Sequence, residues 1–374
     1  MTNGPVHYHQ GEFPPASLRW PELISLIGPA NAALARYEGV LHAVPNAAVL
    51  LSPLTTREAV LSSRIEGTQA TMGEVLEYEA GADAGRVGPE KQEDILEILN
   101  YRTALRRAME LLGELPISGR LIREMHATLM QGVRGRDKAP GEYRRVQNLI
   151  GPPGCDESNA GFVPVGEDKL EAGMSEWEKY LHSTPQDQLV QLAIAHAEFE
   201  SLHPFMDGNG RVGRLLIPLF LYERKLLSEP MFYMSAYLEA QRAEYYERLR
   251  AVSRDGDWTG WVRFFLKAVI EQARSNEVKA RQILELYANL KDRVVDLTHS
   301  QYAIRALDFL FARPIFRANQ FVQDQDVPAP SAQRILRLFR EEGLVATLEQ
   351  ARGRRPGRFV FGDLINIVEG EELF

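Results

Sequence analysis

The chain has 374 residues, 45% of them hydrophobic, and a formal net charge of -8 at pH 7. This length exceeds what a single hydrophobic core usually organises, so we expect two or three domains. The acidic balance argues against a nucleic-acid footprint over the whole surface, although it leaves room for a local basic patch. No signal peptide or membrane-spanning run is recognisable, and a single cysteine, Cys155, excludes an intramolecular disulfide, so we predict a soluble, cytoplasmic protein without a membrane partner.

The first 90 residues indicate a helical region. A weakly periodic stretch over residues 21–41 predicts a peripheral helix. Thr55 and Glu58 follow a proline at capping-box spacing, and they predict a helix over residues 56–66. The same spacing at Thr71 predicts that the next helix begins there.

The middle of the chain is predicted to be mainly helical, because apolar residues recur at helical spacing over most of it. The expected helices cover residues 91–112, 118–130, 167–180, 187–202, 210–225, 241–252 and 258 to about 290. Residues 132–164 interrupt this pattern with glycine, proline and short β-prone pieces, the first of them at 143–150. We expect this insertion to form a hairpin or flap.

The C-terminal part has the order of elements of a winged helix. One helix is expected over residues 302–311 and a second after Ser331, and β-prone strands at 343–346 and 358–361 flank an arginine-rich turn. The arginines of the second helix and of the turn are Arg334, Arg337, Arg340, Arg352, Arg354, Arg355 and Arg358. Glutamates are interspersed among them, so a DNA-binding surface and a merely solvated one both stay open.

The densest chemistry lies in residues 203–214, HPFMDGNGRVGR, between two strongly helical segments. Gly208 and Gly210 let backbone N–H groups approach an anion, and the helix that follows turns its positive end toward the same point. Arg211 and Arg214 are three residues apart, so they share a helix face and could clamp successive phosphates. The segment therefore predicts a phosphate-binding loop that leads into a helix.

Two further residues of this segment suggest phosphoryl or nucleotidyl chemistry. Asp207 offers the hard oxygen ligand that Mg²⁺ prefers beside phosphates, and His203 is placed to take a proton from an incoming hydroxyl. The glycine spacing also matches a dinucleotide-binding fingerprint, but that motif follows a strand, whereas the residues before His203 have helical spacing. The Walker and kinase signatures are absent from the sequence.

The segment HPFMDGNGRVGR resembles the Fic signature HPFxDGNGRxxR and matches it at every fixed position. The resemblance extends from about residue 20 to about residue 290. It implies a mainly α fold, with a Fic helical bundle, a β-hairpin flap, an N-terminal helical region and a small C-terminal winged-helix domain. The corresponding boundaries are 1–90 for the N-terminal region with an inhibitory helix at about 55–67, 91–295 for the Fic domain, and 296–374 for the winged-helix-like domain.

The resemblance implies a protein adenylyltransferase, a nucleotidyltransferase that moves AMP from ATP to a protein hydroxyl and releases pyrophosphate. His203 would be the base and Asp207 the Mg²⁺ ligand. The residues that would bind ATP within the motif are Gly208, Asn209, Gly210, Arg211, Val212, Gly213 and Arg214. Because the reaction is an in-line attack at the α-phosphorus, stabilisation of charge matters more than covalent catalysis.

Two regions outside the motif resemble further Fic features. Asn148, Leu149, Ile150 and Gly151 are similar to the flap that covers the nucleotide and aligns a target segment, with a simple surface hairpin as the alternative. Tyr245 is similar to a residue that contacts the adenosine part of ATP, with a core aromatic on a helix as the alternative.

Residues 62–67, SSRIEG, resemble the inhibitory motif [S/T]xxxE[G/N] of Fic proteins, with Ser62, Glu66 and Gly67 at its fixed positions. Ser62 and Glu66 are four residues apart and project from one helix face. Glu66 could then pair with Arg214 and deny this guanidinium to the γ-phosphate of ATP. The alternative is a solvated glutamate at a helix end.

Two other functions stay open on the sequence alone. The first is a DNA-binding regulator in which the Fic core is accessory, and the second is removal of AMP from a protein, with Glu66 positioning water. The expected partners are ATP and a protein target, which includes the chain itself. The modified residue type, the choice of ATP over other nucleotides, DNA binding and homodimerisation stay open.

Overall fold

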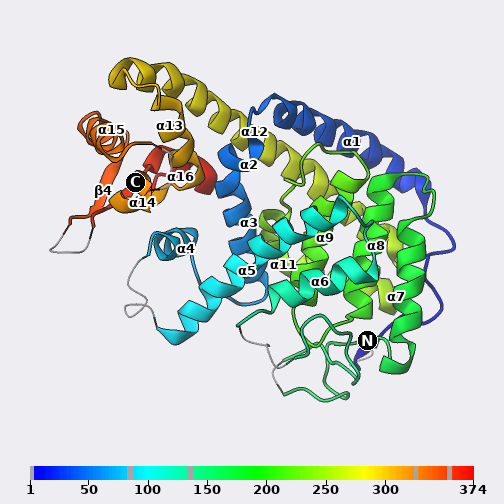
Figure 1. Ribbon diagram of the computed structural model, residues 1–374. Helices are drawn as coiled ribbons and strands as arrows, with labels where there is room; N and C mark the ends of the chain where they lie inside the picture. The colour runs from blue at the N-terminus through cyan, green and yellow to red at the C-terminus, as the bar shows by residue number, and fades with distance from the viewer. Residues whose placement is uncertain (1–3, 82–87, 134–137, 153, 324–326, 352–355) are drawn as a thin grey trace. The chain divides into compact units, whose positions relative to one another are not determined.

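The computed structural model describes residues 4–81, 88–133, 138–152, 154–323, 327–351 and 356–374, and most of these lie in helices (Figure 1). The chain forms two compact units that interleave in sequence. The first unit takes Met1–Glu38, Leu61–Gly67 and Leu99–Arg274, and the second takes Gly39–Val60, Thr68–Ile98 and Ser275–Phe374. The boundaries at residues 90 and 295 stay predictions, because these units are discontinuous and are defined by contacts alone.

The mainly α prediction is confirmed by the first unit, whose centre is helix α8 (Gln188–Leu202). This helix lies between α7 (Glu167–Leu181) and α9 (Asn209–Glu223) and also packs on α11 (Arg242–Asp255) (Figure 1). Almost all of its side chains are buried, since it has helices on several sides. The indoles of Trp177 and Trp261 each donate a hydrogen bond of 2.7 Å to a carbonyl of α8, which fixes the helix from two sides.

The remaining helices with residues in the first unit are α1 (Trp20–Ala43), α3 (Ser52–Ile65), α5 (Pro89–Leu112), α6 (Gly119–Leu129), α10 (Ser235–Ala240) and α12 (Trp258–Thr298). The helix predicted over residues 258–290 is longer than expected, and α10 was not predicted. Ser118 caps α6, and Asp187 caps α8 by accepting hydrogen bonds from the N–H groups of Leu189 and Val190.

The capping box predicted at Thr55 and Glu58 is wrong. Helix α3 already begins at Ser52, so both residues lie inside it. Pro53 occupies the first turn, where a helix needs no N–H donor, and this allows the earlier start. By contrast, the capping box at Thr71 is confirmed at the start of α4 (Met72–Glu79), where the side chain of Glu74 accepts from the N–H of Thr71 at 2.8 Å.

The insertion before α7 returns on itself with little regular pairing. Ile150 forms one antiparallel bridge with Phe162, at the start of β2 (Phe162–Val163). The β-prone piece at 143–150 forms no strand: Ile150 at its end makes the bridge to Phe162, and the N–H of Arg144 near its start donates to the carbonyl of Pro204. The insertion is therefore a minimal hairpin.

A strand that was not predicted, β1 (Val6–His7), pairs in parallel with β2. The two residues that follow β1 extend into the core beside α8. The hydroxyl of Tyr8 donates to Oε1 of Glu198 at 2.6 Å, and Nε2 of His9 lies 2.9 Å from Oε2 of the same carboxylate. These buried contacts tie the N-terminal segment to the first unit.

The second unit contains the elements for which the sequence predicted a winged helix. Its elements follow the order α13 (Ala303–Ala312), β3 (Ile315–Arg317), α14 (Ala318–Gln323), α15 (Ala329–Glu341), β4 (Ala346–Glu349) and β5 (Arg358–Val360), and the sheet is antiparallel with the order β3-β5-β4. The unit also holds α2 (Ala47–Leu50), which packs on α13, α4, which packs on β3, and α16 (Gly362–Glu369). Of these elements, β3, α14, α2 and α16 were not predicted.

The strand predicted over residues 343–346 begins only at Ala346, so its position was wrong by three residues. Gly343 has a positive φ of 70°, and the N–H groups of Leu344 and Val345 bond back to the carbonyl of Phe339. The end of α15 therefore uses the residues that the pattern assigned to the strand.

The surface and the helices give two further observations. Among the described residues, no helix combines the length and the apolar composition needed to cross a bilayer.

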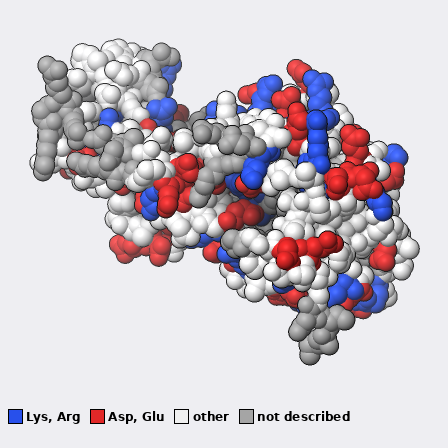
Figure 2. Space-filling model, turned by 90° about the horizontal axis from the view of Figure 1, so that it is seen from below, with Lys and Arg blue, Asp and Glu red and all other residues white. Residues whose placement is uncertain are grey.

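On the face shown in Figure 2, acidic and basic side chains alternate in small groups among uncharged ones. This face accordingly offers no broad area of one charge within the residues that are drawn in colour.

Candidate active site

The loop between α8 and α9 carries the predicted chemistry. His203 follows directly after α8 and has a left-handed backbone, with φ at 50° and ψ at 60°. Gly208 precedes α9 with φ at 76°, a conformation that favours glycine. Because a histidine at positive φ costs free energy, other contacts must hold this turn.

Arg144 supplies these contacts. Its Nε donates to the carbonyl of His203 at 2.9 Å, and one terminal nitrogen donates to the carbonyl of Leu202 at 3.3 Å. Its backbone N–H donates to the carbonyl of Pro204, also at 2.9 Å. The buried Arg144 thus holds the turn before the histidine with its guanidinium and after it with its backbone N–H. The sequence analysis missed Arg144, whose only signal is an arginine in a glycine- and proline-rich insertion.

Asn209 closes the loop. Its Oδ1 accepts from the N–H of Phe205 at 2.8 Å, and its Nδ2 donates to the carbonyl of the same residue, again at 2.8 Å. The side chain was predicted to hold phosphate. Here it is buried, and its donor and acceptor shape the loop whose backbone faces the anion site.

His126 on α6 supports the same loop and was also missed. Its ring stacks on Phe205, with 3.7 Å between ring centroids. The N–H of Gly141 donates to its Nδ1 at 2.8 Å, so Nε2 carries the proton and donates to the carbonyl of Asp207 at 3.0 Å. A histidine in the apolar stripe of the helix predicted at 118–130 was the available signal.

His203 is held as a neutral base. Its Nδ1 lies 3.3 Å from the carbonyl of Glu200, which can only accept, so this nitrogen carries the proton and Nε2 keeps the lone pair. Burial lowers the pKa of His203 to about 4, although the carbonyl of Glu200 and the carboxylate of Glu66 act in the opposite direction. The imidazole can therefore accept a proton at neutral pH.

Arg214 is engaged by the segment that resembles the inhibitory motif. One terminal nitrogen donates to Oε1 of Glu66 at 2.6 Å and to the carbonyl of Ser62 at 2.9 Å, and Nε donates to the hydroxyl of Ser62 at 2.8 Å. The Arg214 side chain is 1% exposed and that of Glu66 is 33% exposed. A side chain at Gly210 would clash with Glu66, so this glycine permits the approach.

The charge of Glu66 follows from this pair. Burial by itself would raise the pKa of Glu66, but the guanidinium of Arg214, with weaker help from Arg211, holds it below its usual value. Glu66 is therefore ionised at neutral pH and forms a charge-assisted pair with Arg214.

A cavity of about 440 Å³ brings the functional groups together. Five predicted site residues, together with Glu66, line it: Ile150, Gly151, His203, Gly210 and Arg214. The lining residues that the sequence analysis did not single out as site residues include Glu200, Arg242 and Tyr246. The guanidinium of Arg242 lies 5.9 Å from the ring centre of Tyr246, at the part of the cavity formed by α11.

Tyr245 does not line this cavity. It is 1% exposed, and its hydroxyl lies 2.9 Å from Nε2 of His196 in the core. This position fits the core-aromatic alternative, and the contact of Tyr245 with adenosine stays a prediction. Successive side chains on a helix point about 100° apart, so Tyr246 faces the cavity in its place.

Other predicted residues lie near the cavity without lining it. Asn148 donates to the carbonyl of Phe205 at 3.2 Å, and Leu149 follows it in the flap. Val212 and Gly213 are buried in α9, where Gly213 lies against Glu200. Arg211 is buried, and one of its terminal nitrogens lies 3.5 Å from Oδ1 of Asp207, close to the cavity rather than on its wall.

Asp207 was predicted to be the Mg²⁺ ligand. Its side chain is 45% exposed, and its Oδ1 accepts from the N–H of Gly208 at 2.6 Å. Within the described ranges, no three His, Cys, Asp or Glu side chains are grouped to hold a metal ion. An exposed carboxylate at a phosphate site nevertheless fits Mg²⁺, which is commonly bound by one carboxylate together with phosphate oxygens.

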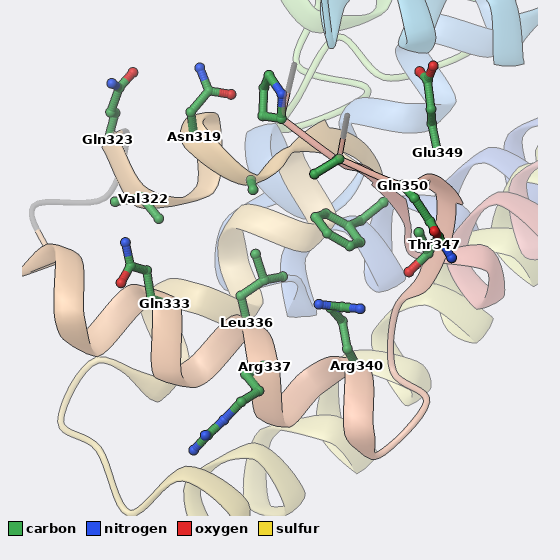
Figure 3. Close-up of a pocket in the computed structure, with 15 residues that line it drawn as sticks. Asn319, Val322, Gln323, Gln333, Leu336, Arg337, Arg340, Thr347, Glu349 and Gln350 are labelled. Atoms are coloured by element: carbon green, nitrogen blue, oxygen red, sulfur yellow. The ribbon is translucent and has the colours of Figure 1, made fainter. Parts of the chain in front are cut away.

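A second cavity, of about 680 Å³, lies in the second unit between α14, α15, β4 and the segment before β5 (Figure 3). The guanidinium of Arg340 lies 5.2 Å from the ring centre of Phe359, and Nε of Arg337, which also lines the cavity, lies 3.8 Å from Oε1 of Glu341. Arg334 donates to a backbone carbonyl, and Arg358 pairs with two glutamates. The described arginines thus have partners within the chain. Arg352, Arg354 and Arg355 lie outside the described residues.

Comparisons with known proteins show which family this chain resembles. Residues 24–110 match the family described as Fic/DOC family N-terminal, and residues 116–221 match the Fic/DOC family, so that the two matches together cover just over half of the chain. A protein adenylyltransferase Fic of Drosophila grimshawi is 28% identical over 65% of this chain and 44% of its own length. The protein of the same name from Drosophila virilis is 30% identical over 54% of this chain and 38% of its own. The chain thus spans less than half the length of these curated relatives.

Two solved structures share the fold. A Fic family protein from Desulfovibrio desulfuricans has a TM-score of 0.59 at 20% identity, over 93% of this chain and 98% of that one. A Fic domain containing signaling protein from Bacteroides thetaiotaomicron has a TM-score of 0.52 at 18% identity, over 68% of this chain and 97% of that one.

Proposed function

The chain belongs to the Fic/DOC family, and on that premise we propose that it transfers AMP from ATP to a hydroxyl side chain of a protein and that Glu66 restrains this activity. The observation that carries the proposal is the convergence of a neutral His203, the start of α9 at Gly210, and Arg214 on one cavity. A base for a hydroxyl and a site for phosphates are the two requirements of nucleotidyl transfer.

His203 would act on the incoming hydroxyl. Its Nε2 takes the proton while the hydroxyl oxygen attacks the α-phosphorus, and pyrophosphate leaves from the opposite side. Arg144 keeps the ring in place through the carbonyl of His203, so less freedom is lost as the reacting groups align.

The phosphates would bind at the start of α9. The backbone N–H groups near Gly208 and Gly210 and the positive end of the helix favour negative charge there, and Arg214 would bind the γ-phosphate. Asp207 would hold Mg²⁺, which supplies positive charge to the phosphate oxygens when it is bound. The adenine ring of ATP would lie toward Tyr246. Ile150 and Pro152 of the flap line the same cavity.

In the described state Glu66 would act as an inhibitor. It occupies Arg214 through the hydrogen bond of 2.6 Å and lies beside Gly210, so the γ-phosphate would have to displace it. The intramolecular position of Ser62 and Glu66 makes this restraint independent of protein concentration. The partnered arginines of the second unit give the DNA-binding alternative no comparable support.

The test is incubation of the full chain with labelled ATP, Mg²⁺ and a cell lysate, followed by mass spectrometry of the labelled proteins. Glu66→Gly should label protein hydroxyls with AMP, and the additional change His203→Ala should remove the label. Labelling that survives His203→Ala, or its absence in all variants, would contradict the proposal. Release of AMP from a premodified protein, without transfer, would favour the reverse reaction.

A further inference from the structure

Glu200 is a buried carboxyl group that the proposed mechanism does not use through its side chain. It lies on α8, three residues before His203, and lines the same cavity as Glu66 and Arg214. The side chain is 12% exposed, and a Cβ added at Gly213 would lie 2.5 Å from its Oε1. This oxygen is buried and has no hydrogen-bond partner among the described residues. A carboxyl oxygen left in this way next to an arginine requires an explanation.

The explanation lies in the charge of Arg214. This guanidinium is buried, and Glu66 neutralises it in the described state. When Glu66 leaves, a buried cation without a counter-charge would be unfavourable. Glu200 is adjacent, since it contacts the residue before Arg214 and lines the same cavity. Both side chains line the same cavity and interact electrostatically, so the freed guanidinium can turn toward Glu200.

We propose that Glu200 is a second acceptor for Arg214, which takes the guanidinium when Glu66 leaves and so sets how strongly the site prefers a nucleoside triphosphate over a diphosphate. This inference rests on the proposed function, in which Arg214 binds the terminal phosphate of ATP. A negative charge close to this arginine opposes the binding of a phosphate there. Glu200 would therefore limit the gain from removing Glu66.

The protonation of Glu200 supports this role. Burial and the nearby carboxylate of Glu66 raise the pKa of Glu200 to about 7, although Arg214 and, more weakly, the hydroxyl of Tyr245 act in the opposite direction. Glu200 can thus share the site with an ionised Glu66 without a full second charge. Once Glu66 has left, its repulsion is lost, and Glu200 ionises more readily.

Among the described groups around Glu200, Arg214 is the cation available for pairing. Nε2 of His196 lies 3.8 Å from Oε1, and burial lowers the pKa of His196 to about 3, so this ring is neutral. Nδ1 of His196 contacts the carbonyl of Gly213 and carries the ring proton, so the hydroxyl of Tyr245 donates to Nε2. The charged and titratable groups around Glu200 are Arg214 on α9, Glu66 after α3, His196 on α8, and Tyr245 and Tyr246 on α11.

The test measures binding in the full chain carrying Glu66→Gly, with and without Glu200→Gln. The probes are α,β-methylene ATP and α,β-methylene ADP, which cannot donate AMP, and their affinities are measured by calorimetry with Mg²⁺ at pH 8. Glu200→Gln should strengthen binding of the triphosphate by about tenfold, as expected for loss of one competing charge-assisted hydrogen bond, and change the diphosphate by less than about twofold. Lowering the pH to 6 should raise the triphosphate preference of the Glu66→Gly parent but not that of the Glu200→Gln variant.

Glu198→Gln in the same background is the matched control. Glu198 is a buried carboxylate on the same helix, but it faces Tyr8 and His9, so its replacement should leave the preference unchanged. Weaker or unchanged triphosphate binding in Glu200→Gln, or equal effects on both nucleotides, would overturn the inference. If Glu200→Gln does not fold, the pH dependence of the Glu66→Gly parent still tests the inference. Protonation of phosphate affects both probes, so a change with pH in the ratio of the two affinities reports on Glu200.

The proposed function is judged separately in the parent variant. If Glu66→Gly transfers AMP and binds both probes but Glu200→Gln has no selective effect, only the role of Glu200 falls. If the parent binds neither probe, the proposed function fails as well.

Discussion

Removal of the Glu66 carboxylate is the sharpest perturbation of the proposed mechanism. Its oxygen lies 2.6 Å from a terminal nitrogen of Arg214, whose side chain is 1% exposed, while Glu66 itself is 33% exposed. A hydrogen bond between charged groups contributes roughly 1.5 to 3 kcal/mol, and the partial exposure places this pair at the lower end. About 1.5 kcal/mol corresponds to roughly a tenfold change in the fraction of Arg214 that is available to ATP.

We therefore expect Glu66→Gly to raise AMP transfer about tenfold at subsaturating ATP. The two hydrogen bonds from Arg214 to Ser62 do not involve the carboxylate, so the arginine should stay near its place. The assay follows incorporation of labelled AMP into protein as a function of ATP concentration. Glu66→Gln is the matched control, because it removes the charge but keeps an acceptor, and it should give a smaller increase.

Combining Arg214→Ala with Glu66→Gly tests the inhibitory role of Glu66. Arg214→Ala should abolish the increase in AMP transfer that Glu66→Gly gives, because this increase requires the arginine that Glu66 restrains. Each variant is first checked by thermal denaturation. Equal transfer in wild type, Glu66→Gln and Glu66→Gly would refute the inhibitory role, provided that the His203→Ala variant is inactive in the same assay.

Three further predictions concern the loop before α9. His203→Ala should lower AMP transfer by about a hundredfold or more while nucleotide affinity in calorimetry stays within a few-fold, and a wild-type rate would contradict a base at this position. In the nucleotide-free protein the His203 ring should titrate by NMR near pH 4 and not near 6.5. The contribution of this ring to stability should therefore fall as the pH drops from 6.5 toward 4. A titration near 6.5 would contradict a buried neutral ring. His126→Phe keeps the stack on Phe205 but loses the hydrogen bond to the carbonyl of Asp207. Chemical denaturation should show a free energy of unfolding lower by about 1 kcal/mol, and AMP transfer should fall. Unchanged values of both would argue against a supporting role.

The sequence predicted those parts of the molecule that depend on local patterns. The helices around the motif follow from apolar spacing, and the capping box at Thr71 follows from two side chains three residues apart. The contact between Glu66 and Arg214, over 148 residues, was expected from two motifs that resemble one family, and the structure places both groups at hydrogen-bond distance.

The sequence did not reveal contacts whose partners are distant and carry no motif. Arg144 bonds to carbonyls about 60 residues away, and any residue can supply a carbonyl, so no pattern marks the pairing. The choice between Tyr245 and Tyr246 depends on the rotation of α11, which apolar spacing fixes too coarsely. Strand β1 is only two residues long, too short for an alternating pattern to stand out.

The pairing of β1 with β2 couples the flap to the amino-terminal segment. Phe162 of β2 lines the cavity, while Val6 pairs with it on one side and Ile150 bridges to it on the other. Tyr8 and His9 anchor the far end of this arrangement at Glu198. A bulky fusion tag or a proteolytic cut close to these residues would consequently loosen one wall of the cavity, so preparations that differ only in their first ten or so residues should differ in nucleotide affinity.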